Sequence, residues 1–204
     1  GLFLTPAKLF SRTAPDIRSA LNTKMSLWYA CILIALLAQF LFIHFRPIFW
    51  ALWRNARLPQ LIYHGGLLCV GGLLAWHFTS PEITWDSFHF LSVLLLIASV
   101  ECAWLASVIV NDCFDIRIDQ KTNTGRPLIT GTIKHGTFAT LGWFFFFGSL
   151  FFSALISFSV SLLLLIYQAL AWMYSAPPLR LKRIPGIATL VAAAAGVIIL
   201  LSGY

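Results

Sequence analysis

Charged residues are scarce in this chain, and acidic ones are the scarcest. Its 204 residues include 14 Lys or Arg and 7 Asp or Glu, together 10%, whereas about a quarter of a soluble domain is charged. No Asp or Glu follows Asp119. With 59% hydrophobic residues and a mean hydropathy of +0.85, the composition excludes an ordinary soluble enzyme and indicates several membrane spans.

Clusters of disulfide-forming or metal-binding residues are also missing from the sequence. Cys31, Cys69, Cys102 and Cys113 show no Cys-x-x-Cys spacing and mostly lie in apolar runs, so we expect small buried side chains. The 5 histidines are too scattered for a metal cluster. The net charge of +7 requires no nucleic acid partner, because basic loops beside anionic lipid account for it.

Long uncharged runs predict the membrane helices. Residues 58–79 and 137–179 contain no charged side chain, and a bilayer core takes about 20 apolar residues per helix. The alternating pattern of a membrane barrel is absent from the sequence, so we expect an all-α, polytopic transmembrane helical bundle. The predicted spans are residues 25–45, 58–79, 88–110, 137–158, 160–174 and 186–204.

Basic residues predict the orientation of this bundle. They occur before the second span, between the third and fourth, and between the fifth and sixth: Arg54 and Arg57; Arg117, Lys121, Arg126 and Lys134; Arg180, Lys182 and Arg183. We therefore place these loops on the cytoplasmic side of an integral, multi-pass membrane protein. A span at 25–45 would put the basic residues before it outside. Residues 1–53 are thus an N-terminal segment that either adds a membrane helix or lies at the interface.

The most polar stretch is NDCFDIRIDQKTNTGRP, residues 111–127. If the third span continues as a helix, Asn111, Asp115 and Asp119 form one stripe, because four residues advance the helix by about 40°. Asp112 lies close beside the stripe, and Glu101 falls on the same sector. Like charges four residues apart destabilise a helix, so a stripe of this kind needs a compensating cation.

Magnesium would supply that compensation. Mg²⁺ prefers carboxylate oxygens and takes its other ligands from water and from substrate phosphates. Lys121 and Arg126 follow the aspartates, so the pattern indicates a site for a Mg²⁺-bridged diphosphate. A solvated surface with weak ion pairs is the alternative.

Three segments resemble the UbiA superfamily of intramembrane prenyltransferases. NDCFDIRID…GRPLITGTI is similar to its first aspartate-rich motif, N-D-x-x-D-x-x-x-D followed by Arg-Pro and Gly. YSAPPLRLKR, residues 174–183, resembles its Tyr-Ser-x-Pro-Pro-x-(Arg/Lys)-x-Lys loop, and RLPQL, residues 57–61, the start of its first helix. The resemblance covers residues 54–204. It implies a partial UbiA-like domain, a helical bundle whose central cavity holds an isoprenoid diphosphate.

The resemblance also implies roles for single residues. Asn111, Asp115 and Asp119, assisted by Asp112, would hold Mg²⁺ and the diphosphate. The substrate-binding residues would be Arg126, which contacts the diphosphate or the acceptor, Tyr174 and Lys182 near the leaving group, and Arg180 and Lys121. The family has a second aspartate motif, which residues 120–204 lack. We therefore expect the chain to be truncated, the N-terminal part of a longer enzyme.

These features predict a Mg²⁺-dependent UbiA-type prenyltransferase. It would move an isoprenyl group from a polyprenyl diphosphate to a lipophilic or aromatic acceptor, surrounded by membrane lipid. Mg²⁺, Lys and Arg stabilise the charge on the leaving diphosphate, and aromatic faces stabilise the allylic cation. The run WFFFF, residues 143–147, would line the cavity or face lipid.

Two alternatives to this function stay open. The same fold would serve phosphoribosyl transfer to a polyprenyl phosphate, because that donor is also a diphosphate. A non-enzymatic ion or lipid transporter would use the carboxylates as an ion site.

Overall fold

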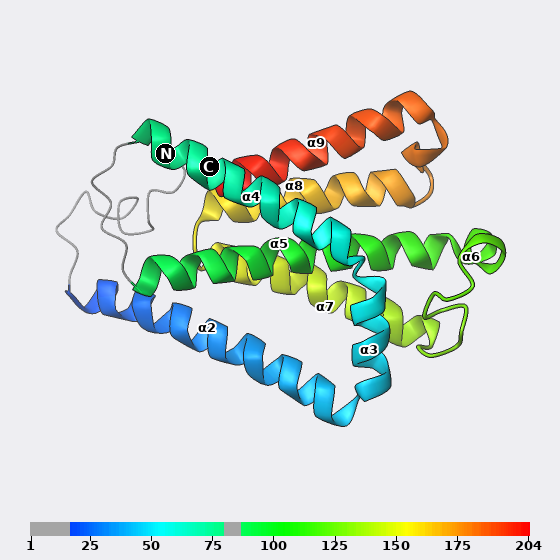
Figure 1. Ribbon diagram of the computed structural model, residues 1–204, viewed down its shortest axis with the longest axis horizontal. Coiled ribbons are helices and arrows are strands. Elements are labelled where there is room, and N and C mark those ends of the chain that lie inside the picture. Colours follow the sequence, from blue (N-terminus) through cyan, green and yellow to red (C-terminus); the bar gives the residue numbers. More distant parts are fainter. Residues whose placement is uncertain (1–16, 80–86) are drawn as a thin grey trace.

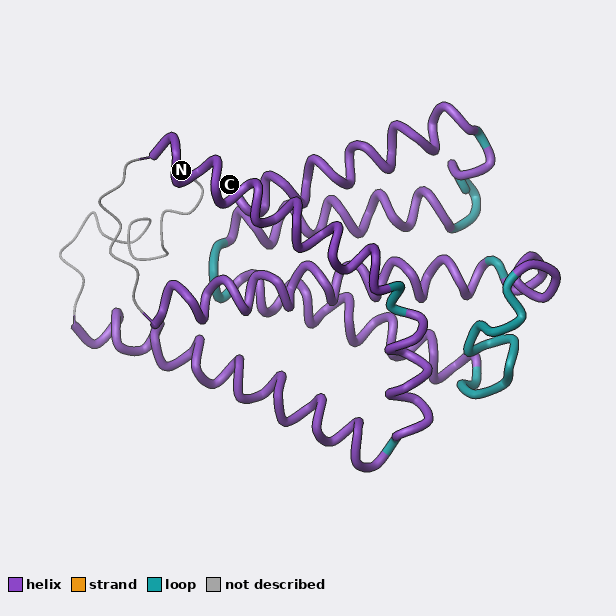
Figure 2. Tube along the Cα trace, viewed as in Figure 1, coloured by secondary structure: helices purple, strands orange, loops and turns teal. Residues whose placement is uncertain are grey.

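The computed structural model describes residues 17–79 and 87–204, which form helices and no strand (Figures 1 and 2). The elements are α2 (Ile17–His44), α3 (Arg46–Asn55), α4 (Leu58–Thr79), α5 (Ser87–Phe114), α6 (Ile116–Thr122), α7 (His135–Ala154), α8 (Phe158–Ser175), η1 (Leu181–Arg183) and α9 (Pro185–Gly203). Residues 80–86, between the predicted second and third spans, lie outside the described residues.

Six helices in the described ranges are long and apolar enough to cross a membrane: α2, α4, α5, α7, α8 and α9. The predicted all-α bundle and its six spans are confirmed. The third span continues to Phe114, past the predicted end at residue 110. Asn111 and Asp112 therefore belong to the last turn of α5, where a membrane helix emerges from the apolar region.

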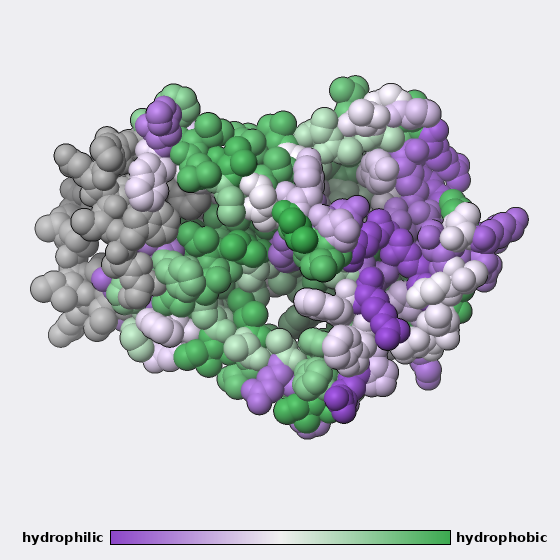
Figure 3. Space-filling view, viewed as in Figure 1, coloured by the Kyte–Doolittle hydropathy of each residue, from purple (hydrophilic) through white to green (hydrophobic). Residues whose placement is uncertain are grey.

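The polar ends of these helices gather at one end of the molecule. α3 crosses the bundle between the ends of α2 and α4, near the end that carries α6 and the α8–α9 connection (Figure 1). Hydrophilic residues concentrate at that same end (Figure 3). α3, which carries Arg54, the α6–α7 connection, which carries Arg126, and η1, which carries Lys182, thus share one end of the bundle.

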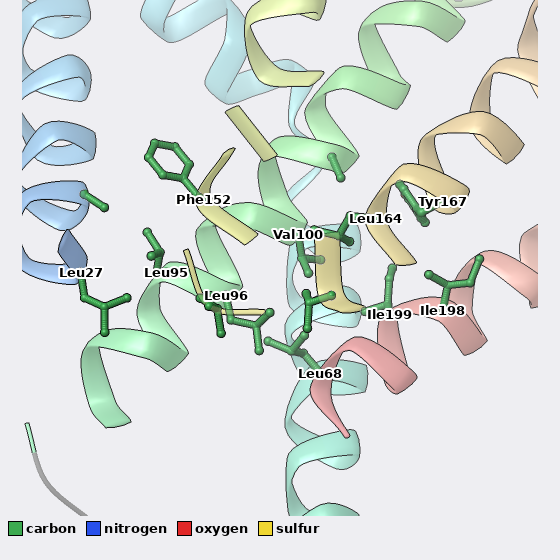
Figure 4. Close-up of a cluster of buried hydrophobic side chains, with 14 residues drawn as sticks. Leu27, Leu68, Leu95, Leu96, Val100, Phe152, Leu164, Tyr167, Ile198 and Ile199 are labelled. Atoms are coloured by element: carbon green, nitrogen blue, oxygen red, sulfur yellow. The ribbon is translucent and has the colours of Figure 1, made fainter. Parts of the chain in front are cut away.

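The core is built around α5, which packs against α2, α7 and α8. Leu95, Leu96 and Val100 of α5 belong to one buried cluster with Leu164 of α8 and Ile199 of α9 (Figure 4). Lipid tails are as apolar as these side chains, so close van der Waals packing holds the helices together in place of the hydrophobic effect. A rigid α5 then fixes the position of the aspartates at its end.

α4 and α9 approach each other closely at two glycines. A Cβ atom on Gly71 would come within 3.0 Å of the carbonyl oxygen of Leu200, and one on Gly203 within 3.0 Å of that of Leu68. Each glycine thus faces the backbone of the opposite helix. Small residues at helix crossings are a common way of bringing membrane helices together.

Candidate functional site

The aspartate-rich segment bends at its middle aspartate. α5 ends at Phe114 and α6 begins at Ile116, and Asp115 between them has φ −104° and ψ 11°. α6 is seen almost end-on in Figure 1, whereas α5 runs across the view. The prediction of one straight stripe through Asn111, Asp115 and Asp119 is therefore wrong. A straight helix would hold the carboxylates on one face, where like charges repel; the bend lets them reach different partners.

Asn111 and Asp115 form one group with the α8–α9 connection. Lys182 Nζ donates hydrogen bonds to Asp115 Oδ2 (2.5 Å) and to Asn111 Oδ1 (2.8 Å). Arg180 Nη2 donates to Asp115 Oδ1 at 2.6 Å, and Ser175 Oγ donates to Asn111 Oδ1 at 3.1 Å. Both carboxylate oxygens of Asp115 are thus paired with a cation, and these bonds tie the end of α5 to η1.

Asp112 forms a second group with α3 and the loop before α7. Its carboxylate is buried, 2% exposed, and Asn55 Nδ2 donates to Oδ2 at 2.8 Å. Arg126 Nη1 donates to Asn55 Oδ1 at 2.6 Å and to Asp112 Oδ2 at 3.4 Å. Arg57 Nη2 lies 3.7 Å from Asp112 Oδ1, near enough for an ion pair. No described residue donates a hydrogen bond to that oxygen.

Asp119 belongs electrostatically to the second group. It is buried, accepts a hydrogen bond from Asn123 Nδ2 at 2.8 Å through Oδ1, and has no partner for Oδ2 within the described ranges. Its charge repels that of Asp112. Burial, and next the charge of Arg126, lower the pKa of Arg57, whereas Asp112 and Asp119 raise it. Asp112, Asp119, Arg57 and Arg126 therefore share one electrostatic environment.

A cavity of about 550 Å³ opens beside this second group, between α3 and residues 123–132. Its basic and amide side chains are Arg54, Arg57, Arg126, Asn55 and Asn123. No Asp or Glu lines it in the part of the chain that the structure describes. An excess of positive charge and of hydrogen-bond donors suits an anion, and guanidinium groups match phosphate oxygens in bidentate geometry.

Two arginines of the site have strained backbones. Arg57 has φ 55° and Arg180 has φ 40°, the left-handed region that non-glycine residues seldom occupy. Arg57 lies against Asp112 and Arg180 against Asp115. Strain of this kind persists where the surrounding structure holds it, often at functional sites.

The structure does not bring all predicted residues together. Lys121 is exposed on α6 and Tyr174 is half-buried on α8, and neither joins the two groups. Asn55 and Ser175 were missed by the sequence analysis. Asn55 is a buried amide in a short amphipathic helix, a signal that could have been noticed, but its pairing with Asp112 depends on the tertiary fold.

Oxygen ligands for a metal ion are present at this site, although the described side chains do not form a ready-made metal-binding cluster. The described residues contain no group of three or more His, Cys, Asp or Glu side chains placed to hold a metal. The unpartnered oxygens of Asp112 and Asp119 suit Mg²⁺, because this ion keeps several waters and usually binds only one or two carboxylates. Asp115 fits less well, because Lys182 and Arg180 occupy both its oxygens.

Comparison with known proteins identifies the family of the chain. Comparison with the curated proteins found no match. The model of the UbiA prenyltransferase family matches residues 66–204, which include Asn111, the three aspartates and the Lys182 loop but not α3. With the match covering more than half of its length, the chain belongs to the UbiA prenyltransferase family, whose members are membrane prenyltransferases.

Proposed function

We propose that the protein transfers an isoprenyl group from a polyprenyl diphosphate to a lipophilic or aromatic acceptor, with Mg²⁺, on the cytoplasmic side of the membrane. The observation that supports this most directly is the arginine-lined cavity beside the unpartnered oxygens of Asp112 and Asp119. The cavity offers cations for the diphosphate, and the two carboxylates next to it, which do not line it, would offer oxygens for a divalent ion.

The cavity's cations would bind the diphosphate. Arg57 and Arg126 lie close enough for the charge of one to lower the pKa of the other, so an anion between them would relieve their repulsion. Asp112 is a counter-charge to both, and Asn55 holds Asp112 and Arg126 in place by a hydrogen bond to each. Arg54, exposed on the last turn of α3, would extend the cationic surface.

Magnesium fits Asp112 and Asp119, which would hold it together with the diphosphate. When bound, it would neutralise the negative charge that grows on the leaving diphosphate. The protein's own part is to hold both carboxylates at the end of α5 and in α6, next to guanidinium groups that contact the same phosphates. The membrane keeps water from the allylic cation.

Lys182 and Arg180 would act as a second set of cations for the leaving group. In the structure they hold Asp115 and, through Lys182, Asn111. An arriving diphosphate competes for these ammonium and guanidinium groups, which would free an oxygen of Asp115 for the metal. The predicted roles of Asn111, Asp115, Lys182 and Arg180 belong to this proposal.

The test measures diphosphate release by the full-length protein in liposomes, with geranylgeranyl diphosphate and a lipophilic aromatic acceptor, or with phosphoribosyl diphosphate and a polyprenyl phosphate acceptor. We expect Mg²⁺-dependent release from the prenyl donor. Arg126→Gln should raise the KM for this donor by about tenfold or more, because a charged hydrogen bond to a phosphate contributes about 1.5–3 kcal/mol. Arg117→Gln, at an exposed position on α6, is the matched control.

Three outcomes would contradict the proposal. Release from the phosphoribosyl donor alone would favour the phosphoribosyl alternative. An unchanged KM for the prenyl donor in Arg126→Gln would show that the diphosphate does not bind in the cavity. Cation transport without release of diphosphate from either donor would favour the transporter alternative.

A further inference from the structure

Asp112 and Asp119 each have one oxygen that accepts a hydrogen bond and one that does not. In Asp112, Oδ2 accepts from Asn55 Nδ2 at 2.8 Å and from Arg126 Nη1 at 3.4 Å. In Asp119, Oδ1 accepts from Asn123 Nδ2 at 2.8 Å. The other two oxygens, Asp112 Oδ1 and Asp119 Oδ2, are buried and have no donor among the described residues. Each carboxylate is therefore fixed on one side, and the partner on its other side is exchangeable.

The guanidinium of Arg57 lies beside the exchangeable oxygen of Asp112. Its Nη2 is 3.7 Å from Asp112 Oδ1, a distance that suits an ion pair but is too long for a hydrogen bond. Burial lowers the pKa of Arg57 most, followed by the charge of Arg126, whereas the charges of Asp112 and Asp119 raise it. Both aspartates therefore attract the same guanidinium, which charge alone holds at Asp112.

Arg57 also has room to leave this position. Its side chain is 33% exposed, whereas that of Asp112 is 1% exposed. Arg57 lines the cavity of about 550 Å³ between α3 and residues 123–132. Its backbone, at φ 55°, has a conformation that persists only where the surrounding structure holds it, so the long side chain is the part that can move. A weakly held cation thus has an open space next to it.

We propose that Arg57 occupies the position at Asp112 and Asp119 that Mg²⁺ takes, and that Mg²⁺ displaces its guanidinium into the cavity. The inference rests on the proposed assignment of Mg²⁺ to these two aspartates. It explains why two carboxylate oxygens without hydrogen bonds are nevertheless covered. Two cations repel each other strongly in a buried place, so binding of the metal requires the guanidinium to leave. The released guanidinium then adds a positive charge to the cavity that the diphosphate would enter.

A purely structural Arg57 would have the opposite effect on metal binding. If its ion pair only held Asp112 in place, loss of Arg57 would loosen the carboxylate and weaken metal binding. If Arg57 competes with the metal, its loss strengthens binding. Any cation of the cavity also repels a metal through space, so Arg54 is the matched control: it lines the same cavity and is exposed, whereas Asp112 is paired with Asn55, Arg57 and Arg126.

The first experiment measures binding of Mn²⁺, a paramagnetic substitute for Mg²⁺, by electron paramagnetic resonance. It uses the full-length protein in nanodiscs of neutral lipid, without diphosphate, and assigns to the site the binding that Asp112→Asn removes. Arg57→Gln should bind Mn²⁺ about fivefold more tightly than the wild type, the equivalent of a partly exposed ion pair of about 1 kcal/mol. Arg54→Gln should change the affinity by about twofold at most, because solvent and salt screen an exposed charge. Unchanged or weaker binding in Arg57→Gln, or equal strengthening in both variants, would overturn the inference.

The second experiment follows Arg57 in the wild-type protein. Phenylglyoxal modifies guanidinium groups, and one that is paired with a carboxylate reacts more slowly than a free one. Mg²⁺ should therefore speed the modification of Arg57 relative to that of Arg117, which is exposed on α6, as quantified by mass spectrometry. A ratio that Mg²⁺ leaves unchanged would contradict displacement. This result does not depend on the folding of any variant.

The outcomes distinguish this inference from the proposed function. If Mn²⁺ binding depends on Asp112 but Arg57→Gln does not strengthen it, the metal assignment stands and the displacement of Arg57 is wrong. If Asp112→Asn and Asp119→Asn both leave Mn²⁺ binding unchanged, the metal assignment is wrong and the displacement is wrong with it.

Discussion

The crossing of α4 and α9 gives a prediction whose size can be worked out from the structure. In Gly71→Ala, the new methyl group would come within 3.0 Å of the backbone of α9 at Leu200, and it would also lie 3.0 Å from the amide nitrogen of Tyr204. Backbone atoms cannot rotate away as the end of a side chain can. The two helices must therefore separate, and the reciprocal contact of Gly203 with Leu68 is lost as well.

The expected cost comes from two opposing effects. Alanine favours a helix over glycine by up to about 1 kcal/mol. Separating packed surfaces by about 1 Å forfeits up to half of their dispersion attraction, and overpacking of this kind costs typically 1–3 kcal/mol. Because the obstacle is backbone, we take the upper end of that range, so Gly71→Ala should lower the free energy of unfolding by about 2 kcal/mol net.

The control is Gly66→Ala on the same helix, where nothing lies within 4 Å of the added Cβ. It keeps the gain in helix propensity without the clash, so it should be neutral or slightly stabilising. Unfolding in detergent micelles, followed by circular dichroism against denaturant or temperature, compares the two variants. If Gly71→Ala proved as stable as Gly66→Ala, the close packing of α4 on α9 would be refuted.

Four further predictions concern the candidate site. Asp115→Asn should abolish turnover and also lower the free energy of unfolding by roughly 2 kcal/mol, because Lys182 and Arg180 lose a partly buried counter-charge. Asp119→Asn should abolish turnover with little loss of stability in the same denaturation assay, since it relieves the repulsion of Asp112; near-normal rates in both would argue against the metal assignment. Lys182→Ala should raise the KM of the diphosphate donor more than that of the acceptor, and the reverse order would contradict its placement. Chelation of Mg²⁺ with EDTA should stop diphosphate release, and added Mg²⁺ should restore it; release that persists in EDTA would exclude the metal.

The membrane spans could be predicted because they depend on local composition. A long uncharged run such as residues 137–179 is stable only in a membrane or in a protein core. Its composition alone therefore predicts α7 and α8. The aspartate motif was found for a similar reason, since polar residues stand out in an apolar chain. The domain boundary between residues 53 and 54 stays a prediction.

The partners of the aspartates could not be predicted in this way. A helical projection assumes one straight axis, and it placed Asn111, Asp115 and Asp119 together. The structure instead pairs Asp115 with Lys182, 67 positions later, and Asp112 with Asn55, 57 positions earlier. Such pairings depend on which helix ends meet in space, and no local pattern in the sequence reports that.

The left-handed backbones of Arg57 and Arg180 bear on any attempt to make this protein more resistant to heat. Glycine adopts that conformation freely, so replacing either arginine with glycine would release about 1–2 kcal/mol of local strain. The same exchange would delete a guanidinium that faces Asp112 or Asp115. The loss of that counter-charge offsets the release of strain. A screen for thermal stability alone would therefore not reveal that such a variant has lost a cation of the site, and it needs a ligand-binding measurement beside it.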